Sequence, residues 1–444
     1  MASDDVFKTS PEVFNDVWVT GKPTNTKWNI NCKNGCVESV VESGHSATNQ
    51  KASRLLCPSL CHPHIHLDKC FLLSHPRYAD LEVKEGDFAE ALSITSEAKS
   101  RFTHEDLMER GRALVNESIN FGVTHMRAFV EVDQGVKMKC LDAGLALKAE
   151  FKDRCHIQIC VFAQDPIFSY KDQGEIMIGL LQQALSRPGV EVLGSTPYVE
   201  KTYENQVRNI EWTLRSCLER ELHVDFHMDY NLEPRNEVFT VIAIQRAKEY
   251  KWPVDNGCKT IVFGHCTRLS LFTKAEWRSL KKDIGQLPVS FVGLPTSDLF
   301  MMGRPGSDDF GGGERVRGTL QILQMIEEYG LDAAIGINNV GNAFTPQGSC
   351  DPLALASLGV GIYQAGTTAD AELLLQCVSN RAKTAIGIKS SLGSGVNVGD
   401  PFDFVIFGDS TSTESFRRRK TTQDLVYDAG HERQTVFHGK VVSR

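Results

Sequence analysis

The chain of 444 residues is long enough for one large domain with a smaller one attached to it. Its content of 41% hydrophobic and 23% charged residues is ordinary for a globular protein. The formal net charge of −8 disfavours nucleic acid and anionic membranes as partners, because both select basic surfaces. No apolar stretch approaches the roughly 20 residues that cross a bilayer, and the N-terminus lacks the pattern of a signal peptide.

The 13 cysteines follow no regular disulfide or metal-binding spacing, which indicates reduced thiols. We therefore expect a cytoplasmic protein that acts on a small molecule, without a nucleic-acid or membrane partner. The sequence leaves the oligomeric state open, and a homo-oligomer is compatible with it.

Through the middle of the chain, strand-like segments alternate with helical ones. The first strand-like segment ends at His66, and seven follow: Val123–Val130, His156–Ala163, Val190–Val199, His223–Tyr230, Thr260–Cys266, Val289–Leu294 and Asp332–Asn339. Eight such units predict an α/β fold with parallel strands, a closed (β/α)8 TIM barrel. A doubly wound open sheet is the alternative, but no Gly-x-Gly-x-x-Gly motif follows the first strand.

Both ends of the chain lie outside these eight units. Short extended segments occur at Asp16–Val19 and Trp28–Asn31, and again at Phe402–Phe407 and Thr435–Val442. Together they predict a small β-sandwich that is built from both termini. The expected division is 1–55 for the first part of this small domain, 56–390 for the barrel and 391–444 for the second part.

Histidines stand at the C-terminal ends of three predicted strands. His64 and His66 end the first strand and project to one face because residues two apart in a strand do so. His227 lies near the end of the fifth strand, and His265 ends the sixth. Active sites of such barrels lie at this rim, and neutral imidazoles are common metal ligands. A single histidine there is usually an ordinary buried side chain, but four at one rim predict a metal site.

These motifs resemble those of the amidohydrolase superfamily, and within it the cytosine-deaminase-like branch. The similar segments are Pro63–Asp68, Phe121–Arg127, Phe226–Asp229 and Phe263–Cys266. The resemblance implies a metal-dependent hydrolase that acts on carbon–nitrogen bonds other than peptide bonds. It implies one divalent transition metal, Zn²⁺ or Fe²⁺, held by three histidines that correspond here to His64, His66 and His227.

Further residues follow from the same resemblance. The segment Val161–Asp165 resembles the one whose glutamine binds the amide edge of a pyrimidine, which implies that role for Gln164. Phe344 lies where the branch has an aromatic residue that stacks on the substrate. His265 would stabilise the developing oxyanion or orient the attacking water.

Two catalytic positions depart from the pattern of the branch. Asn338 stands where the branch has a metal-binding aspartate that takes a proton from water, and Tyr230 stands where it has a proton-shuttling glutamate. An amide can offer a carbonyl oxygen to a metal but cannot act as a base near neutral pH. Tyrosine, with an ordinary pKa of about 10, is a poor substitute for a carboxylate. Asp229, Asp68 or a group on the substrate would have to replace the missing base.

Three functional hypotheses remain open. The first is a hydrolase in which a metal-activated water attacks a C–N bond of a small cyclic amide, amidine or aminated heterocycle. The second is a lyase or isomerase reaction on the same metal scaffold, which the loss of both carboxylates favours. The third is a catalytically inactive homologue that binds a small molecule, although such a protein would be expected to lose its histidines as well.

Overall fold

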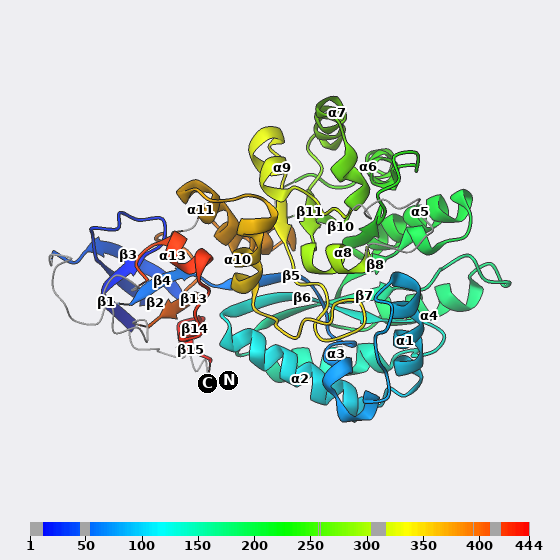
Figure 1. The fold of residues 1–444 in the computed structure, drawn as a ribbon, viewed down its shortest axis with the longest axis horizontal. Coiled ribbons are helices and arrows are strands. Elements are labelled where there is room, and N and C mark those ends of the chain that lie inside the picture. Colours follow the sequence, from blue (N-terminus) through cyan, green and yellow to red (C-terminus); the bar gives the residue numbers. More distant parts are fainter. Residues whose placement is uncertain are drawn as a thin grey trace, which may run out of the picture.

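The computed structural model describes residues 12–44, 54–255, 257, 259–302, 317–393, 395–408 and 419–443. Two sheets organise these residues into a larger and a smaller domain, which lie side by side (Figure 1). The parts of the predicted terminal segments at 1–11, 45–53 and 409–418 lie outside the described residues.

The larger domain is built on an eight-stranded sheet whose strands follow one another in chain order and are all parallel. The strands are β5 (Leu60–His66), β6 (Val123–Glu131), β7 (His156–Ala163), β8 (Val190–Ser195), β9 (His223–Met228), β10 (Ile261–His265), β11 (Val289–Gly293) and β12 (Ala333–Ile335). Every residue of β5, β6 and β9 is buried, as expected for strands covered on both faces.

The sheet closes into a barrel just beyond β12. The backbone N–H of Asn338 donates to the carbonyl of His64 at 3.1 Å, and the N–H of His66 donates to the carbonyl of Asn338 at 2.8 Å. The predicted TIM barrel is therefore confirmed, and residues from the first and last strand segments are joined at the rim.

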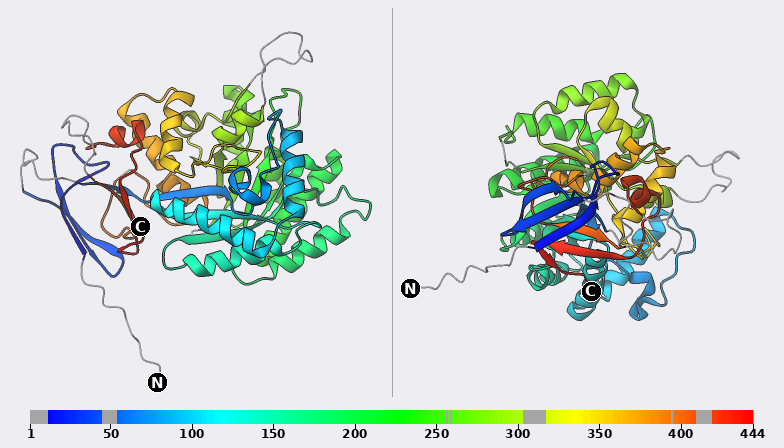
Figure 2. Two further views of the ribbon diagram at one scale, coloured as in Figure 1. Left: turned by 60° about the horizontal axis from the view of Figure 1, so that its bottom comes forward. Right: turned by 90° about the vertical axis from the view of Figure 1, so that its left-hand side faces the viewer.

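Helices surround this barrel (Figures 1 and 2). Those between or after the strands are α2 (His104–Asn120), α3 (Lys139–Phe151), α4 (Glu175–Leu185), α5 (Tyr203–Arg220), α6 (Phe239–Glu249), α7 (Lys274–Ile284), α9 (Ile322–Tyr329), α10 (Pro352–Ile362), α11 (Thr368–Cys377) and α12 (Asn380–Ala385). Side-chain caps fix several helix starts; for example, the Thr103 hydroxyl accepts from the backbone N–H of Asp106 at 3.3 Å.

Additional helices lie in the loops at the rim and bring side chains over the barrel mouth. The loop after β5 contains α1 (Phe88–Ser100) and two 3-10 turns, Leu72–Ser74 and Pro76–Tyr78, and α8 (Pro295–Met301) follows β11 directly. Shorter 3-10 segments are Pro197–Val199 and Thr267–Leu271.

The smaller domain combines both ends of the chain, as predicted. Its sheet has the order β15-β14-β13-β4-β1-β2-β3. The strands are β1 (Glu12–Val19), β2 (Trp28–Lys33), β3 (Cys36–Glu42), β4 (Leu55–Pro58), β13 (Phe404–Phe407), β14 (Arg433–Phe437) and β15 (Lys440–Val441). Helix α13 (Thr422–Tyr427), between β13 and β14 in the chain, packs against α10 and α11. The junction with the barrel falls at Ser59, since β4 pairs with β1 and β13.

Arg433 connects the two domains through an ion pair and a hydrogen bond. Its guanidinium pairs with the Asp351 carboxylate, and one N–H also donates to the carbonyl of Phe121 at 2.8 Å. The side chains of both charged residues are almost completely buried. This contact joins the small sheet to the ends of two barrel helices.

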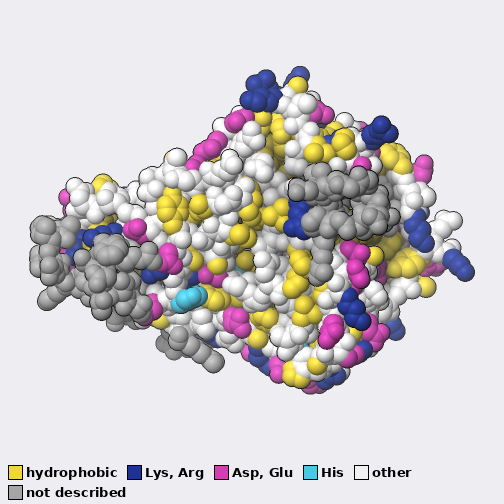
Figure 3. Space-filling view, in the orientation of Figure 1, with side chains coloured by type: hydrophobic (Ala, Val, Ile, Leu, Met, Phe, Trp, Pro, Cys, Tyr) yellow, Lys and Arg dark blue, Asp and Glu magenta, His cyan; other side chains and the backbone are white. Residues whose placement is uncertain are grey.

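On the face shown in Figure 3, acidic and basic side chains are interspersed around the outer helices. Among the described residues, no helix is both long enough and apolar enough to traverse a lipid bilayer.

An ion pair lies inside the barrel beneath its mouth. Arg127 on β6 donates to the Asp225 carboxylate on β9 at 2.7 Å and to Gln158 on β7 at 2.7 Å. Both charged side chains have no exposed surface. The pair is thus shielded from water and links three strands.

We expect Arg127→Met to lower the free energy of unfolding by about 3–5 kcal/mol, because it leaves Asp225 buried without its partner. Urea unfolding measures the change. Arg112→Met is the matched control: Arg112 pairs with Glu150 at 2.8 Å on the surface and should cost less than about 1 kcal/mol. Equal effects of the two substitutions would contradict the assigned role of the buried pair.

Candidate metal centre

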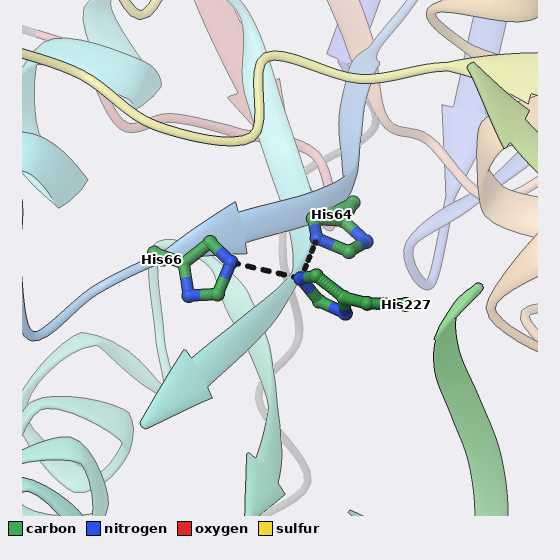
Figure 4. A group of neighbouring side chains, drawn as sticks. All are labelled: His64, His66 and His227. Atoms are coloured by element: carbon green, nitrogen blue, oxygen red, sulfur yellow. Dashed lines mark hydrogen bonds between the residues drawn. The ribbon is translucent and has the colours of Figure 1, made fainter. Parts of the chain in front are cut away.

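Three imidazoles converge at the mouth of the barrel (Figure 4). His64 and His66 come from the end of β5, and His227 comes from the adjacent part of β9 across the barrel interior. The Nε2 atoms of His64 and His66 each lie 3.2 Å from Nε2 of His227. Within the described ranges these three histidines form the one cluster of side chains with metal-ligand spacing.

The surroundings keep these imidazoles neutral. All three are buried, with at most 2% of each residue exposed. Burial lowers the pKa of each ring well below its usual value, and the neighbouring imidazoles and Lys69 act in the same direction. A neutral imidazole offers a lone pair, so three lone pairs can be directed at one point.

The geometry fits a divalent transition metal. Bonds of about 2.0–2.1 Å from zinc to histidine nitrogen place two tetrahedral ligands roughly 3.3 Å apart, close to the observed separations. Asn338 Oδ1, which belongs to the last strand segment, is buried and finds no hydrogen-bond donor among the described residues. The amide nitrogen of Asn338 donates to the Ser297 hydroxyl at 2.9 Å, which fixes the orientation of the amide. Its Oδ1 is therefore available as a further oxygen ligand.

Close backbone packing fixes the His64 ring. A Cβ atom on Gly264 of β10 would lie 3.1 Å from Cε1 and 3.3 Å from Nδ1 of this imidazole. On another side, the ring lies against Phe129 with centroids 4.1 Å apart. The absence of a side chain at Gly264 therefore provides the space that the imidazole of His64 occupies.

His265 lies beside the cluster and is oriented by a carboxylate. Its ring centroid is 5.1 Å from that of His227, and its Nδ1 lies 2.7 Å from Asp298 Oδ1. Asp298 is fully buried, and its other oxygen accepts from the Thr319 hydroxyl at 2.7 Å. The carboxylate places the proton on Nδ1, so Nε2 of His265 is the acceptor atom of this ring.

Tyr230 packs against His265 but cannot act as a base. Their ring centroids are 4.8 Å apart, and burial, with the nearby Asp298 carboxylate, raises the pKa of the phenol above its usual value. The strand also ends earlier than predicted, since β9 stops at Met228 and Asp229 has a φ of +48°. This turn moves Tyr230 out of the strand register. With Tyr198 it forms the wall between the site and a more open hollow of about 930 Å³.

A small pocket opens beside the cluster and is lined by two of its histidines, His66 and His227. Two side chains assigned to substrate binding line it: Gln164, which follows β7, and Phe344, which lies in the segment after β12. The remaining lining residues are His66, Lys69, Phe88, Tyr198, His227, Tyr230, His265, Ser297, Met301, Asn338 and Asn339. The structure therefore brings all the predicted site residues together, except that His64 lies just beneath this lining.

Lys69 and Asp298 are part of the site, and the sequence reasoning missed both. Lys69 Nζ donates to Glu131 Oε1 at 2.6 Å and to Gln164 Oε1 at 3.2 Å. The available signals were the position of Lys69 directly after Asp68, and that of Asp298 in the turn following the seventh barrel strand. Neither signal predicts which partner the side chain contacts.

The two aspartates considered as replacement bases are held elsewhere. Asp229 accepts from the backbone N–H groups of Phe239 and Thr240, both at 2.9 Å, and so caps α6. Asp68 accepts from the backbone N–H of Glu131 at 2.6 Å. Within the part of the chain that the structure describes, the pocket lining contains no aspartate or glutamate.

A parallel barrel that carries a histidine cluster at its C-terminal rim is the arrangement of a metal-dependent barrel enzyme. The model of the Amidohydrolase family matches residues 55–442, and the chain belongs to that family. It is an enzyme of the amidohydrolase type, a class of metal-dependent enzymes that hydrolyse carbon–nitrogen bonds other than peptide bonds.

Individual relatives are distant. The chain is 22% identical over 375 residues to the N-isopropylammelide isopropyl amidohydrolase of Pseudomonas sp. (strain ADP), covering 83% of this chain and 84% of that protein. The 5-methylcytosine deaminase of Klebsiella pneumoniae, solved with 5-fluorocytosine, superposes with a TM-score of 0.79 at 20% identity over 98% of each chain. The N-isopropylammelide isopropylaminohydrolase of Burkholderia multivorans ATCC 17616 gives 0.74 at 18% identity, over 98% of this chain and 99% of that one.

We expect Gly264→Ala to weaken metal binding, because the added methyl group would press on the His64 ring. Titration of the metal-free protein with Zn²⁺ should show at least a tenfold higher Kd. Gly361→Ala in α10 is the control, since its methyl group would meet nothing within 4 Å. Unchanged zinc affinity in a folded Gly264→Ala protein would show that the packing of Gly264 against the His64 ring does not affect metal binding.

Proposed function

We propose that this chain hydrolyses a C–N bond, other than a peptide bond, of a small cyclic amide, amidine or aminated heterocycle. The observation that carries the proposal is the convergence of three neutral imidazoles beneath a small pocket whose wall includes a polar amide, Gln164, and an aromatic ring, Phe344. A planar heterocycle can lie against the ring of Phe344 while its polar edge meets Gln164. The names of the amidohydrolase and deaminase relatives support the same class of substrate.

His64, His66 and His227 would hold the metal, with Asn338 Oδ1 as a neutral oxygen ligand. Zn²⁺ and Fe²⁺ both suit a set of imidazole ligands, and either supplies a Lewis acid that lowers the pKa of water and polarises the substrate. Because all four groups are neutral, they would leave the double charge of the ion undiminished. The ion would then favour negative charge that develops on a substrate oxygen.

His265 is the proton acceptor that the pocket provides. Its Nε2 receives a proton from water while Asp298 holds Nδ1–H and stabilises the imidazolium that results. The same Nε2 can then return the proton to the departing nitrogen. In this arrangement the histidine and its buried aspartate take over the role of the two missing carboxylates.

A lyase or isomerase reaction is the second candidate. It is favoured by the absence of carboxylates from the described pocket lining, together with the neutral Asn338 and the high pKa of Tyr230. Such a reaction needs a polarised carbonyl but no attacking water. Uptake of oxygen from water separates the two candidates, because only the hydrolase adds water across the C–N bond that it breaks.

To test the hydrolase, the metal content of the purified protein is measured, and a panel of aminated heterocycles and cyclic amides is assayed in oxygen-labelled water by mass spectrometry. We expect roughly one transition metal per chain, lost in His227→Ala, and labelled product from the metal-loaded wild type. Asn338→Asp serves as a comparison, since it adds the carboxylate of the cytosine-deaminase-like pattern. Absence of bound metal under metal-replete conditions would contradict the hydrolase, and conversion of substrate without uptake of labelled oxygen would favour the second candidate.

We expect Asp298→Asn to lower kcat by about 10²–10⁴-fold with the metal still bound, because the amide no longer fixes the His265 tautomer. Steady-state kinetics and elemental analysis together check this. Asp229→Asn is the control, because Asp229 caps a helix and faces away from the pocket. A kcat within threefold of wild type in Asp298→Asn would remove His265 as the proton acceptor.

A further inference from the structure

Lys69 is a buried cation whose side chain lines the substrate pocket. Only 2% of the residue is exposed, and its ammonium lies 5.0 Å from the centroid of the Phe344 ring. Glu131 neutralises it: although burial alone would raise the pKa of that carboxyl, Lys69 and Lys99 lower it to about 2. The 2.6 Å contact between Lys69 Nζ and Glu131 Oε1 is a buried ion pair, with about 2% of each side chain exposed.

The ammonium has one donor left for a ligand. Lysine carries three N–H donors, and two of them go to Glu131 Oε1 and Gln164 Oε1. The described residues supply no third acceptor in the hydrogen-bond network of Lys69. Since the side chain lines the pocket, the remaining N–H is available to a molecule bound there.

Lys69 also determines what Gln164 offers to the pocket. Gln164 Oε1 accepts from the ammonium. The group of Gln164 that remains for a ligand is therefore its amide NH₂, which is a hydrogen-bond donor. A flip of the amide would place its NH₂ group next to the ammonium, where two hydrogen-bond donors would face each other without an acceptor. The two side chains therefore present donors only, where a free glutamine would present one donor and one acceptor.

From this geometry we propose that Lys69 and Gln164 form a paired donor site that selects substrates with an anionic or doubly oxo-substituted edge, such as a deprotonated cyclic imide. This inference rests on the proposed function only for the identity of the pocket, and it narrows the substrate class. A neutral ring that directs an N–H group at Gln164 meets another donor, and one unpaired buried polar group weakens binding by about 10- to 100-fold.

Calorimetry with two flat ring probes tests the proposal. Barbiturate is an anion at neutral pH, and its deprotonated edge carries two oxygens that flank a ring carbon without any N–H group. Cytosine is neutral and carries a ring N–H next to its only oxygen. With the metal-loaded wild type, we expect a Kd for barbiturate at least tenfold lower than that for cytosine. Chromatography of the recovered probes shows that each ligand is unchanged.

Two substitutions separate this role from simple stabilisation. Lys69→Met removes the donor and frees Gln164 to turn over, so the preference for barbiturate should fall to within about twofold. Gln164→Glu keeps a partner for Lys69 but presents an acceptor, so cytosine should become the better ligand. Either variant serves alone if the other does not fold.

Lys383→Met is the matched control, since Lys383 is also a buried lysine but lies at the opposite end of the barrel, where it donates to Ser59 at 2.8 Å. It should keep the wild-type preference. Equal binding of both probes by wild type, no binding of either, or an unchanged preference in Lys69→Met would overturn the proposal. Because the measurement needs no turnover, a protein that prefers barbiturate yet hydrolyses none of the assayed compounds supports the donor pair while contradicting the hydrolase.

Discussion

The site depends on the seam that closes the barrel. Two backbone hydrogen bonds join Asn338 to His64 and His66, the two metal ligands that β5 supplies. The hydrogen bonds that close the sheet therefore also place Asn338 Oδ1 next to the histidines. His227 then completes the cluster from β9, which lies across the barrel interior. The metal centre is a property of the closed barrel rather than of any one loop.

Periodicity was sufficient to predict the barrel and the place of the histidines. Buried parallel strands separated by amphipathic helices leave few alternatives, and residues at strand ends must meet at one rim. His64, His66, His227 and His265 are found there because each ends or nearly ends a strand. The local pattern carries enough information whenever a residue's role follows from its position along a strand.

Residues whose roles depend on distant contacts could not be predicted in this way. Lys69 contacts Glu131 and Gln164, which are 62 and 95 residues away in the chain, and nothing near Lys69 indicates either partner. Tyr230 was placed by extending a strand, but the left-handed conformation of Asp229 ends that strand early. The preference of Asp229 for capping the next helix overrides the alternation on which the prediction relied.

The position of β4 has a consequence for biosynthesis. This strand ends at Pro58, two residues before the strand that carries His64 and His66, and it lies between β1 and β13. Ribosomes deliver the N-terminal part of a chain first, so β4 lacks its second neighbour until Phe404–Phe407 has been made. Until then it presents an unpaired, apolar edge, the kind of surface that recruits other chains into aggregates. The nascent protein is therefore prone to aggregate through the edge of β4 until β13 has left the ribosome and paired with it.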